Sequence, residues 1–403
     1  MRVNRTLTKE ATAVAVSIGL GLSGNALADK PSFAGASPDV LNAANNCIVR
    51  FKDDVPRADV SGRARGLLAR ANAVNNASAK LKHVYQHSIK GFTLTMPCHA
   101  ASRAFGNDPM VQSLEVDSIV FMNPRPPGKG PGGGGGGDTS PDPQETPWGI
   151  ARVGGPQDGT GYTAWVLDTG IDVDHPDLNV DAARGFSAFT SRKDAGVDDG
   201  QGHGTHVAGT IAALNNNRDV VGVAAGASVV PVKVLDRRGS GSTSGSTSGV
   251  IAGVDFVGAN ASPGDCANMS LGGGISTNLD DAVVAAAAES GAFFTLAAGN
   301  ESQNANNSSP ARANGNNVFT ISAHDSLDGL ASFSNYGNPP VDYAAPGVGV
   351  LSTKKGGGTV TYSGTSMAAP HACAVLMLNA GNPSTDGTIS NDRDSTPDPI
   401  IHL

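Results

Sequence analysis

The sequence predicts an α/β protein in which a doubly wound, mostly parallel sheet follows a small α+β domain. Three observations support this prediction. The chain has 403 residues with 53 glycines and only 16 % charged residues, a composition that excludes a coiled coil or a helical bundle. A Pro/Gly-rich segment divides it into a short first part and a longer second part. In the second part, short apolar runs alternate with helical segments, as in a parallel sheet with helices on both faces.

The first 28 residues are typical of a signal peptide. Arg2, Arg5 and Lys9 form a basic start, the apolar run 11–22 follows, and Ala-Leu-Ala at 26–28 offers a cleavage site. The run is shorter than the roughly 20 residues that a membrane span needs, so we expect no membrane anchor. A buried first helix is the alternative. The segment therefore predicts a secreted, extracellular protein, in which disulfides are permitted.

Residues 29–122 are predicted to form the first domain. From residue 46 onward the pattern is strand, helix, strand, strand, helix, strand, which is the ferredoxin-like order and implies a small sheet covered on one side. The expected strands are 47–51, 84–87, 91–96 and 111–116, and the expected helices are 58–79 and 97–107. A further apolar run, Ile-Val-Phe-Met, occupies 119–122.

Four cysteines are available for disulfides. In the ferredoxin-like order the first strand pairs antiparallel with the third, which brings the start of one beside the end of the other. Cys47 opens the first strand and Cys98 follows the third, so this pair suits a disulfide. Cys266 and Cys373 are left as either a second pair or two buried thiols.

Residues 123–143 are predicted to be a linker. They contain a proline-rich stretch and consecutive glycines at 132–137, a composition that can neither bury a core nor hold one conformation. A phosphate-binding loop is the alternative for glycines around Lys129. However, no Ser or Thr follows this lysine and no strand precedes the segment. The second domain is therefore expected at 144–403.

From residue 147 onward, strands and helices alternate. We expect strands at 163–167, 229–235, 267–271, 293–297 and 318–323, and helices that open at His203 and that span 249–257 and 278–290. In such a sheet, functional groups lie on loops beyond the carboxyl ends of the strands.

Charge is distributed unevenly between the two parts. Residues 1–143 carry 16 Lys and Arg against 11 Asp and Glu, whereas 144–403 carry 12 against 25. The net charges are therefore +5 and −13, within a total of −8. The acidic second part argues against nucleic acid as a partner. A basic small part and an acidic large part suggest that the two bind each other.

Three segments place a reactive side chain at a glycine-rich corner. Asp168 ends an apolar strand, His203 opens a helix in Gly-His-Gly-Thr-His, and Ser366 opens another in Ser-Gly-Thr-Ser-Met. A serine becomes an effective nucleophile when an imidazole takes its proton, and a carboxylate has to hold that imidazole in one tautomer. The three residue types together predict nucleophilic catalysis by a serine.

With these motifs in the order Asp, His, Ser, the chain resembles the subtilase family of secreted serine proteases with an inhibitor-type propeptide. The resemblance covers about 147–382, and more weakly 46–122. It implies a subtilisin-like catalytic domain and a precursor whose first domain chaperones and inhibits the second. It also implies that Asp168 orients the imidazole, that His203 is the general base and acid, and that Ser366 is the nucleophile.

The family's oxyanion-hole asparagine is matched by Asn300, which follows the strand 293–297. The resemblance implies that its side-chain amide and the backbone N–H of Ser366 bind the oxyanion. His206 and His203 could be read as two metal ligands, but no His-Glu-x-x-His motif occurs, so we expect His206 to pack inside its helix. We also expect Thr169 to hydrogen-bond Asp168.

An extended substrate is implied to add as a strand between two edges. One edge is the segment 269–274, and the other follows Leu235, before a Ser/Thr/Gly-rich tract at 242–248 that is longer than in typical subtilisins. The small residues Ala298, Gly299 and Ala311 would line the primary pocket together with Pro310, and they would leave room for a large apolar side chain. The expected substrate-binding residues are Gly239, Ser240, Gly241, Ser270, Leu271, Gly272, Ala298 and Gly299, with Ala311 beside the pocket.

Calcium is the cofactor that the resemblance implies. The loop 214–220 keeps the length of the family's calcium loop. Oxygen atoms of carboxylates, amides and carbonyls suit Ca²⁺. An ordinary polar surface loop is the alternative. The expected ligands are Gln144, Asp177, Leu214, Asn216, Arg218 and Val220, with Arg218 contributing only its carbonyl.

The sequence therefore predicts a secreted, monomeric serine endopeptidase that hydrolyses proteins or peptides through an acyl-enzyme and is processed from its own precursor. The propeptide would be its intramolecular inhibitor. A catalytically idle binding protein with this fold is the alternative, but it would not need the intact motifs. A lipase or esterase would need Gly-x-Ser-x-Gly, and the sequence at 364–368 lacks the last glycine.

The end of the chain departs from the family. The helix after Ser366 reads His-Ala-Cys-Ala at 371–374, where Val-Ala-Gly is usual, and the closing helices are expected to be missing or very short. This departure bears on the stability of the C-terminal edge more than on catalysis.

Overall fold

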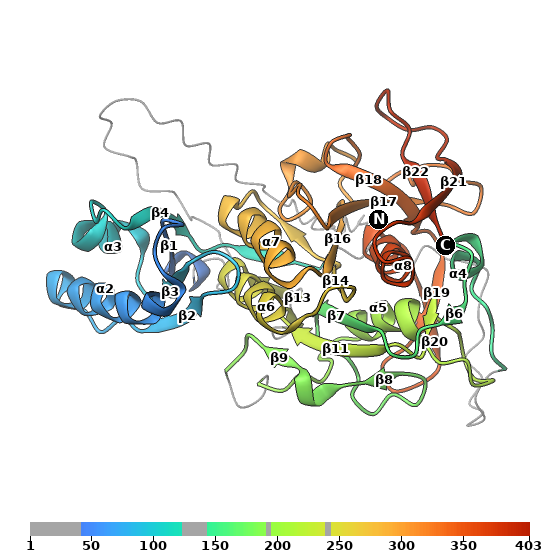
Figure 1. Ribbon diagram of the computed structural model, residues 1–403, viewed down its shortest axis with the longest axis horizontal. Coiled ribbons are helices and arrows are strands. Elements are labelled where there is room, and N and C mark those ends of the chain that lie inside the picture. The colour runs from blue at the N-terminus through green and yellow to red at the C-terminus, as the bar shows by residue number, and fades with distance from the viewer. Residues whose placement is uncertain (1–41, 123–142, 191–194, 238–242) are drawn as a thin grey trace, which may run out of the picture.

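The computed structural model describes residues 42–122, 143–190, 195–237 and 243–403. The predicted signal peptide and nearly all of the predicted linker lie outside these residues. The described chain forms a small domain that packs against one side of a much larger one (Figure 1). Together they confirm the predicted α/β class with a smaller α+β domain in front.

The small domain has the predicted order of strands and helices. Its strands are β1 (Cys47–Phe51), β2 (Leu81–Tyr85), β3 (Gly91–Leu94) and β4 (Val111–Val116), and its helices are η1 (Arg57–Asp59), α2 (Val60–Asn75) and α3 (Cys98–Phe105). The antiparallel sheet runs β2-β3-β1-β4, which is the ferredoxin-like arrangement. Helices α2 and α3 bury Leu67 and Phe105 against Val49, Phe51 and Phe92 of the sheet.

A disulfide joins Cys47 to Cys98, as the strand order predicts. Strand β1 pairs with β3 so that Cys47 lies opposite Leu94. This register brings Cys98, at the start of α3, to a Cα–Cα distance of 4.8 Å from Cys47. The bond therefore ties the first strand to the helix that covers it.

The large domain is built on a central sheet. Its order is β21-β22-β18-β17-β16-β14-β7-β11-β8, with β9 also paired to β11. Neighbours are parallel throughout except for the edge pair of β21 and β22, so the predicted doubly wound, mostly parallel sheet is confirmed. The strands are β7 (Thr163–Asp168), β8 (Asn179–Val180), β9 (Phe186–Ser187), β11 (Ser228–Lys233), β14 (Cys266–Met269), β16 (Phe293–Ala297), β17 (Val318–His324), β18 (Val341–Pro346), β21 (Ser384–Thr388) and β22 (Pro399–His402).

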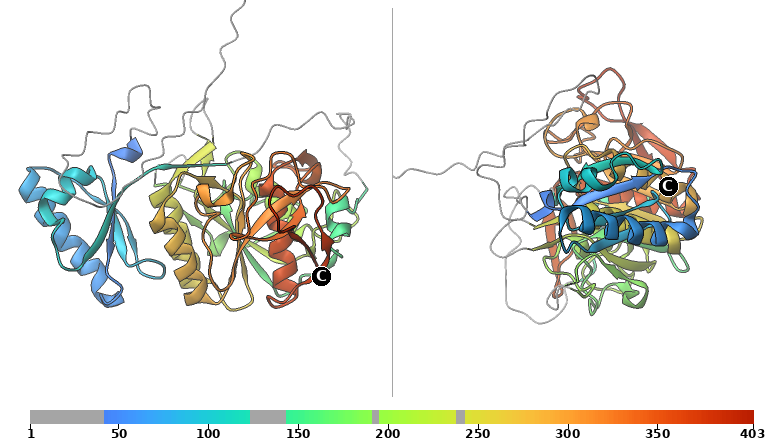
Figure 2. Two further views of the ribbon diagram at one scale, coloured as in Figure 1. Left: turned by 90° about the horizontal axis from the view of Figure 1, so that it is seen from above. Right: turned by 90° about the vertical axis from the view of Figure 1, so that its left-hand side faces the viewer.

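Helices cover both faces of this sheet (Figure 2). Helices α5 (His203–Ala212) and α8 (Thr365–Leu378) pack on one face, and α6 (Thr247–Asn260) and α7 (Thr277–Ser290) pack on the other. Alternate residues of β7 supply the two cores: Val166 faces α5 and α8, whereas Trp165 and Leu167 face α6 and α7. Among the described residues, no helix is long and apolar enough to span a membrane.

Serine side chains start the helices of the second face. The hydroxyl of Ser246 accepts a hydrogen bond from Gly249 N at 3.1 Å, and that of Ser276 accepts one from Leu279 N at 3.1 Å. These caps satisfy backbone N–H groups that have no partner within the helix. They explain why α6 begins two residues before the predicted helix.

A short strand of the small domain's C-terminal end lies within the large domain. Strand β5 (Ile119–Phe121) pairs antiparallel with β13 (Thr243–Ser246) on one side and with β15 (Gly272–Gly273) on the other. Strand β12 (Asp236–Arg237) completes this second sheet beside β13.

The remaining elements are α4 (Trp148–Arg152), η2 (Ala182–Arg184), η3 (Ala305–Asn307), the pair β6 (Gln157–Asp158) and β10 (Ala224–Ala225), and the hairpin β19 (Val350–Thr353) and β20 (Thr359–Tyr362).

The C-terminal edge is closed by strands rather than by helices. Strand β22 adds parallel to β18, and β21 adds antiparallel to β22. Ile400 and Ile401 of β22 are fully buried. The closing helices are thus absent from residues 379–403, as predicted, and apolar side chains of β22 cover the edge in their place.

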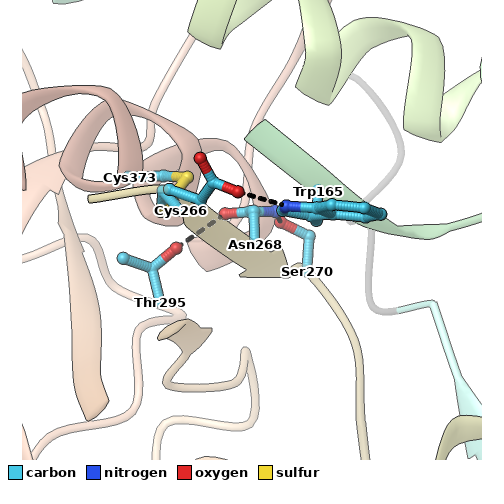
Figure 3. The surroundings of a disulfide bond; sticks show 7 residues. Trp165, Cys266, Asn268, Ser270, Thr295 and Cys373 are labelled. Atoms are coloured by element: carbon cyan, nitrogen blue, oxygen red, sulfur yellow. Dashed lines mark hydrogen bonds between the residues drawn. A yellow bond between two sulfur atoms is a disulfide. The ribbon is translucent and has the colours of Figure 1, made fainter. Parts of the chain in front are cut away.

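Cys266 and Cys373 form a second disulfide, which the sequence left open. It joins β14 to α8 across a separation of 107 residues, and both cysteines are fully buried. Figure 3 shows the bond beside Asn268, Ser270 and Thr295. The bond therefore ties the helix that carries Ser366 to the middle of the sheet.

We expect replacement of both Cys266 and Cys373 by alanine to destabilise the large domain. A disulfide that closes a long loop typically contributes about 2–4 kcal/mol, mainly by restricting the unfolded chain. The melting temperature of a domain of this size should then fall by about 5–15 °C. Calorimetry measures the change, and Cys47→Ala with Cys98→Ala is the matched control for the small domain. An unchanged melting temperature of the large domain would contradict the prediction.

Candidate active site

Asp168 and His203 form a buried pair at the end of the parallel sheet. Asp168 is the last residue of β7 and His203 is the first residue of α5, and both are fully buried. His203 Nδ1 lies 2.8 Å and 2.9 Å from the two carboxylate oxygens of Asp168. Because the carboxylate accepts the Nδ1 proton, Nε2 is left unprotonated in the neutral imidazole. His203 Nε2 has no hydrogen-bond partner among the described residues.

Asp199 holds the helix that carries His203. Its carboxylate accepts hydrogen bonds from Gly202 N at 2.7 Å, Thr205 N at 3.0 Å and Thr205 Oγ1 at 2.6 Å, at the start of α5. It also accepts one from Thr169 Oγ1 at 2.8 Å. The expected hydrogen bond between Thr169 and the Asp168 carboxylate is present, but it comes from the backbone N of Thr169, at 2.7 Å, rather than from its hydroxyl.

The sequence analysis missed Asp199. An acidic residue close before a helix start is a capping signal, and Asp199 stands four residues before His203. Asp199 also accepts a hydrogen bond from Thr169, the residue after Asp168, and no pattern in the sequence indicates this contact.

Ser366 lies in the first turn of α8 and is fully buried. Its hydroxyl donates to Ser270 O at 3.3 Å, and the hydroxyl of Ser270 donates to Ser366 O at 2.8 Å. Ser270 is bonded in turn by Asn268 Nδ2 at 2.9 Å, and Asn268 accepts from Thr295 Oγ1 at 3.1 Å. This buried hydrogen-bond chain runs from β16 through β14 to Ser366, and Figure 3 shows the side chains of Thr295, Asn268 and Ser270.

Asn300 lies just beyond the carboxyl end of β16. Its side-chain oxygen accepts hydrogen bonds from Thr365 N at 2.9 Å and Thr365 Oγ1 at 3.1 Å. Thr365 directly precedes Ser366, so the amide of Asn300 is attached to the first residue of α8. With the oxygen bound on that side, the orientation of the amide is fixed.

Strand β5 lies between β13 and β15, and β15 belongs to the segment 269–274 that was expected to form one edge for substrate. On one side Phe121 lies opposite Gly272, next to Ser270 and Leu271. On the other side Val120 lies opposite Gly245 of β13. Gly239, Ser240 and Gly241 lie outside the described residues, and the edge that pairs with β5 is 243–246, farther along the Ser/Thr/Gly-rich tract.

The two residues expected in the primary pocket precede Asn300 directly. Ala298 is fully buried against Ala305, Ala311 and Val341. Gly299 has a φ of +108°, a conformation that side chains rarely adopt. Both residues therefore present little more than backbone to their surroundings.

The expected calcium ligands gather around Asp177. Gln144 Nε2 donates to Leu214 O at 2.7 Å and to Val220 O at 3.3 Å, and Asn216 Nδ2 donates to Asp177 Oδ1 at 2.9 Å. Asp177 Oδ2 is buried and has no hydrogen-bond partner in the described part of the chain. Burial raises the pKa of Asp177 to about 7.

Arg218, the remaining expected ligand, is half-buried and donates its backbone N–H to Asn216 Oδ1 at 3.1 Å. Within the described ranges, no three His, Cys, Asp or Glu side chains are grouped to hold a metal. A cation at this place would therefore depend on one carboxylate together with amide and carbonyl oxygens.

Two other histidines of the helices α5 and α8 are buried without a charged partner. His206 Nε2 lies 3.1 Å from Val350 O, and burial lowers the pKa of His206 to about 3. His371 Nδ1 lies 2.8 Å from Met367 O, and burial lowers the pKa of His371 to about 4. His206 is thus a packed helix residue, as expected.

Comparisons with known proteins point to one family. A family profile described as "Subtilase family" matches residues 159–389. The alkaline serine exoprotease A of Vibrio alginolyticus is 41 % identical over 315 residues, which cover 75 % of this chain but only 53 % of that protein. A subtilisin-like serine protease of Sarocladium strictum is 39 % identical over 321 residues, covering 75 % of this chain and 74 % of that protein. The crystal structure of a cold adapted subtilisin-like serine proteinase is 38 % identical with a TM-score of 0.54, covering 63 % of this chain and 97 % of that one.

We expect His371 to make the protein less stable in acid. Its native pKa of about 4 lies below the ordinary value of 6.5. Its contribution is therefore intact above pH 6.5 and is lost as the pH falls toward 4. At pH 5 the loss is about 2 kcal/mol, or about 4–8 °C in melting temperature.

A His371→Gln variant should show a smaller drop in melting temperature between pH 7 and pH 5 than the parent. The half-buried His402 provides the control, and His402→Gln should keep the parental drop. An equal drop in the parent and in His371→Gln would refute the assignment.

Proposed function

The chain belongs to the subtilase family of serine proteases, and we propose that it is a secreted endopeptidase that hydrolyses peptide bonds through an acyl-enzyme. The observation that carries the proposal is the buried Asp168–His203 pair at the end of β7. With its Nδ1 proton bound to a carboxylate, His203 offers Nε2 as a base inside the protein. The hydroxyl that uses this base in our proposal is that of Ser366, at the start of α8.

The reaction follows from the roles of these groups. Ser366 Oγ turns from Ser270 O toward His203 Nε2, gives its proton to Nε2 and attacks the substrate carbonyl carbon. The Asn300 amide and the Ser366 backbone N–H donate to the oxyanion that forms. His203 then passes the proton to the leaving amine, and water hydrolyses the acyl-enzyme by the same steps in reverse order.

Strand β5 supports an extended mode of substrate binding. It lies as the middle strand between β13 and β15, so main-chain hydrogen bonds hold it on both sides. Its side chains alternate: Val120 is 2 % exposed among apolar residues, whereas Phe121 is 40 % exposed. A bound peptide that replaced β5 would be recognised mainly by its backbone and by an apolar side chain in place of Val120.

We propose further that the small domain is an inhibitory propeptide and folding aid. Its 86–88 loop is bound to α6 of the large domain. Asp255 Oδ1 accepts hydrogen bonds from Gln86 N at 2.8 Å, His87 N at 2.6 Å and Ser88 N at 2.8 Å. A single carboxylate oxygen thus holds three successive backbone N–H groups of the other domain.

Two carboxylates of the small domain cap helices of the large one. Asp117 Oδ1 accepts from Ser248 N at 2.9 Å in the first turn of α6. Glu115 Oε2 accepts from Asn278 N at 3.3 Å in the first turn of α7. Carboxylates at helix N-termini satisfy free N–H groups and interact favourably with the helix dipole. Since these helices form one whole face of the large domain, the contacts support a role in its folding.

Ion pairs across the same interface agree with the uneven charge of the two parts. Arg50 pairs with Asp281, and Arg57 Nη2 lies 2.7 Å from Glu289 Oε2. In both pairs the cation comes from the small domain and the anion from α7. While the domains are joined, β5 lies between β13 and β15, and this position supports a role in inhibition.

We propose that the oxygen atoms around Asp177 hold a structural Ca²⁺ ion. The unpartnered, buried Asp177 Oδ2 fits such an ion, because a buried carboxylate oxygen without a donor is costly. The neighbouring oxygens belong to Leu214, Val220 and the side chains of Gln144 and Asn216, the hard ligands that Ca²⁺ prefers. The ion would neutralise the buried carboxylate and join the start of the large domain to the loop after α5.

Chelation should lower the melting temperature of the parent protein but not that of an Asp177→Ala variant. Binding only to the folded state contributes about 2.7 kcal/mol at a hundredfold excess over Kd. Thermal inactivation in calcium and in a chelator measures the effect. Asp181→Ala, which removes a half-exposed carboxylate on the neighbouring loop, should respond as the parent does. If Asp177→Ala stays as calcium-sensitive as the parent, the site has been misplaced.

A Ser366→Ala variant tests the proposed function directly. After signal removal we expect it to fold, to remain one uncut chain and to hydrolyse no peptide substrate. The parent should instead be cut between Met122 and Gln144 by its own activity. Ser363→Ala, on the segment before α8, is the matched control and should mature normally. Intact mass and gel analysis decide the question: Ser366→Ala cut at the parental rate, with no other protease present, would exclude Ser366 as the nucleophile of maturation.

A further inference from the structure

Asn335 lies behind the loop that carries Asn300. It belongs to the segment between β17 and β18, and its side chain is fully buried. Its amide nitrogen donates to Ala298 O at 2.9 Å and to Glu301 Oε2 at 2.8 Å. Its amide oxygen accepts from Glu301 N at 3.1 Å and from Gln303 N at 3.0 Å.

All four hydrogen bonds that an asparagine side chain can form are thus made to the single loop 298–303. Two are donated and two are accepted, which is the full capacity of the amide. The backbone N of Asn335 adds a fifth bond, to Gly299 O at 2.9 Å. Such bonds hold their partners firmly when they are shielded from water.

Gly299 permits the close approach of Asn335. A Cβ atom on Gly299 would overlap Asn335 Nδ2, and the φ of +108° also favours glycine there. On its other side, Gly299 N donates to Thr365 Oγ1 at 3.1 Å. Asn300 is therefore held on two sides. Asn335 holds its neighbours Gly299 and Glu301, and Thr365 at the start of α8 holds its amide oxygen.

We propose that Asn335 is a positioning residue for the oxyanion: it holds the backbone on both sides of Asn300 so that the Asn300 amide meets the negative charge that develops during attack. The proposal rests on the proposed function, because it assumes that Asn300 donates to the oxyanion. An oxyanion donor acts at short range and depends on its placement before the reaction. A loop released from Asn335 would keep Asn300 in the chain but misplace its amide.

Variants at Asn335 should change the rate of the chemical step rather than substrate binding. Asn335→Ser shortens the side chain and breaks the bonds to the loop. Asn335→Asp keeps the shape and the two accepted bonds but loses both donated bonds and brings a negative charge beside Glu301. For each variant we expect kcat to fall about ten- to a hundredfold, within the roughly 10²–10³ that the loss of one oxyanion donor typically costs, with KM changed less than about twofold.

A double-mutant cycle with Asn300→Ala separates positioning from general support. If Asn335 acts through Asn300, Asn335→Ser should lower kcat by less than about twofold in the Asn300→Ala background. A purely structural role would give the same loss in both backgrounds. Asn317→Ser is the matched control: it removes a part-buried amide that donates to Gly291 O, away from the oxyanion loop, and should lower the melting temperature without lowering kcat.

The measurements are kcat and KM on a peptide substrate with fully processed protein, at temperatures well below each melting temperature. If Asn335→Ser does not fold, Asn335→Asp carries the same test. An unchanged kcat in the Asn335 variants, equal losses in both backgrounds, or an equal loss in Asn317→Ser would overturn the positioning role. If Asn300→Ala itself leaves kcat unchanged, the oxyanion assignment in the proposed function fails instead.

Discussion

The burial of the Asp168 carboxylate is the constraint on which the rest of the site depends. A carboxylate removed from water has to be given hydrogen-bond donors. Here the donors are His203 Nδ1 and the backbone N–H of Thr169, so α5 has to begin beside the end of β7. The buried charge of Asp168 thereby determines where α5 starts and which tautomer His203 adopts. It also leaves His203 Nε2 facing away from the carboxylate.

Each group with a proposed role in the reaction is supported by a residue that has no such proposed role. Asp199 holds the start of α5, Ser270 holds the backbone of Ser366, and Asn335 holds the loop around Asn300. All three supports are buried polar side chains with several hydrogen bonds, and they come from loops or strand ends rather than from the helices themselves. The sheet therefore acts as the fixed frame, and the two helices of one face are attached to it at their first turns.

Much of this arrangement could be predicted from the sequence, because strand order and helix starts leave local signals. The strand order of the small domain predicted the Cys47–Cys98 bond, and the end of an apolar strand predicted the location of Asp168. The pairing of β5 with 243–246 could not be predicted, since Ser and Gly recur throughout the tract 242–248 and no one segment of it stands out. Asn335 left no signal either, because most of its partners are backbone atoms about 35 residues earlier in the chain, which only the folded protein brings near.

The disulfide between Cys266 and Cys373 has a consequence for a protein of a protease family if its own chain is cut. Asn300 and Ser366 both lie inside the loop of chain that this bond closes, whereas Asp168 and His203 lie before it. A single cut anywhere between the two cysteines leaves two fragments that are still joined through sulfur. The fragment with Ser366 cannot diffuse away from β14, so a nicked molecule keeps all of its reactive groups in one covalent unit.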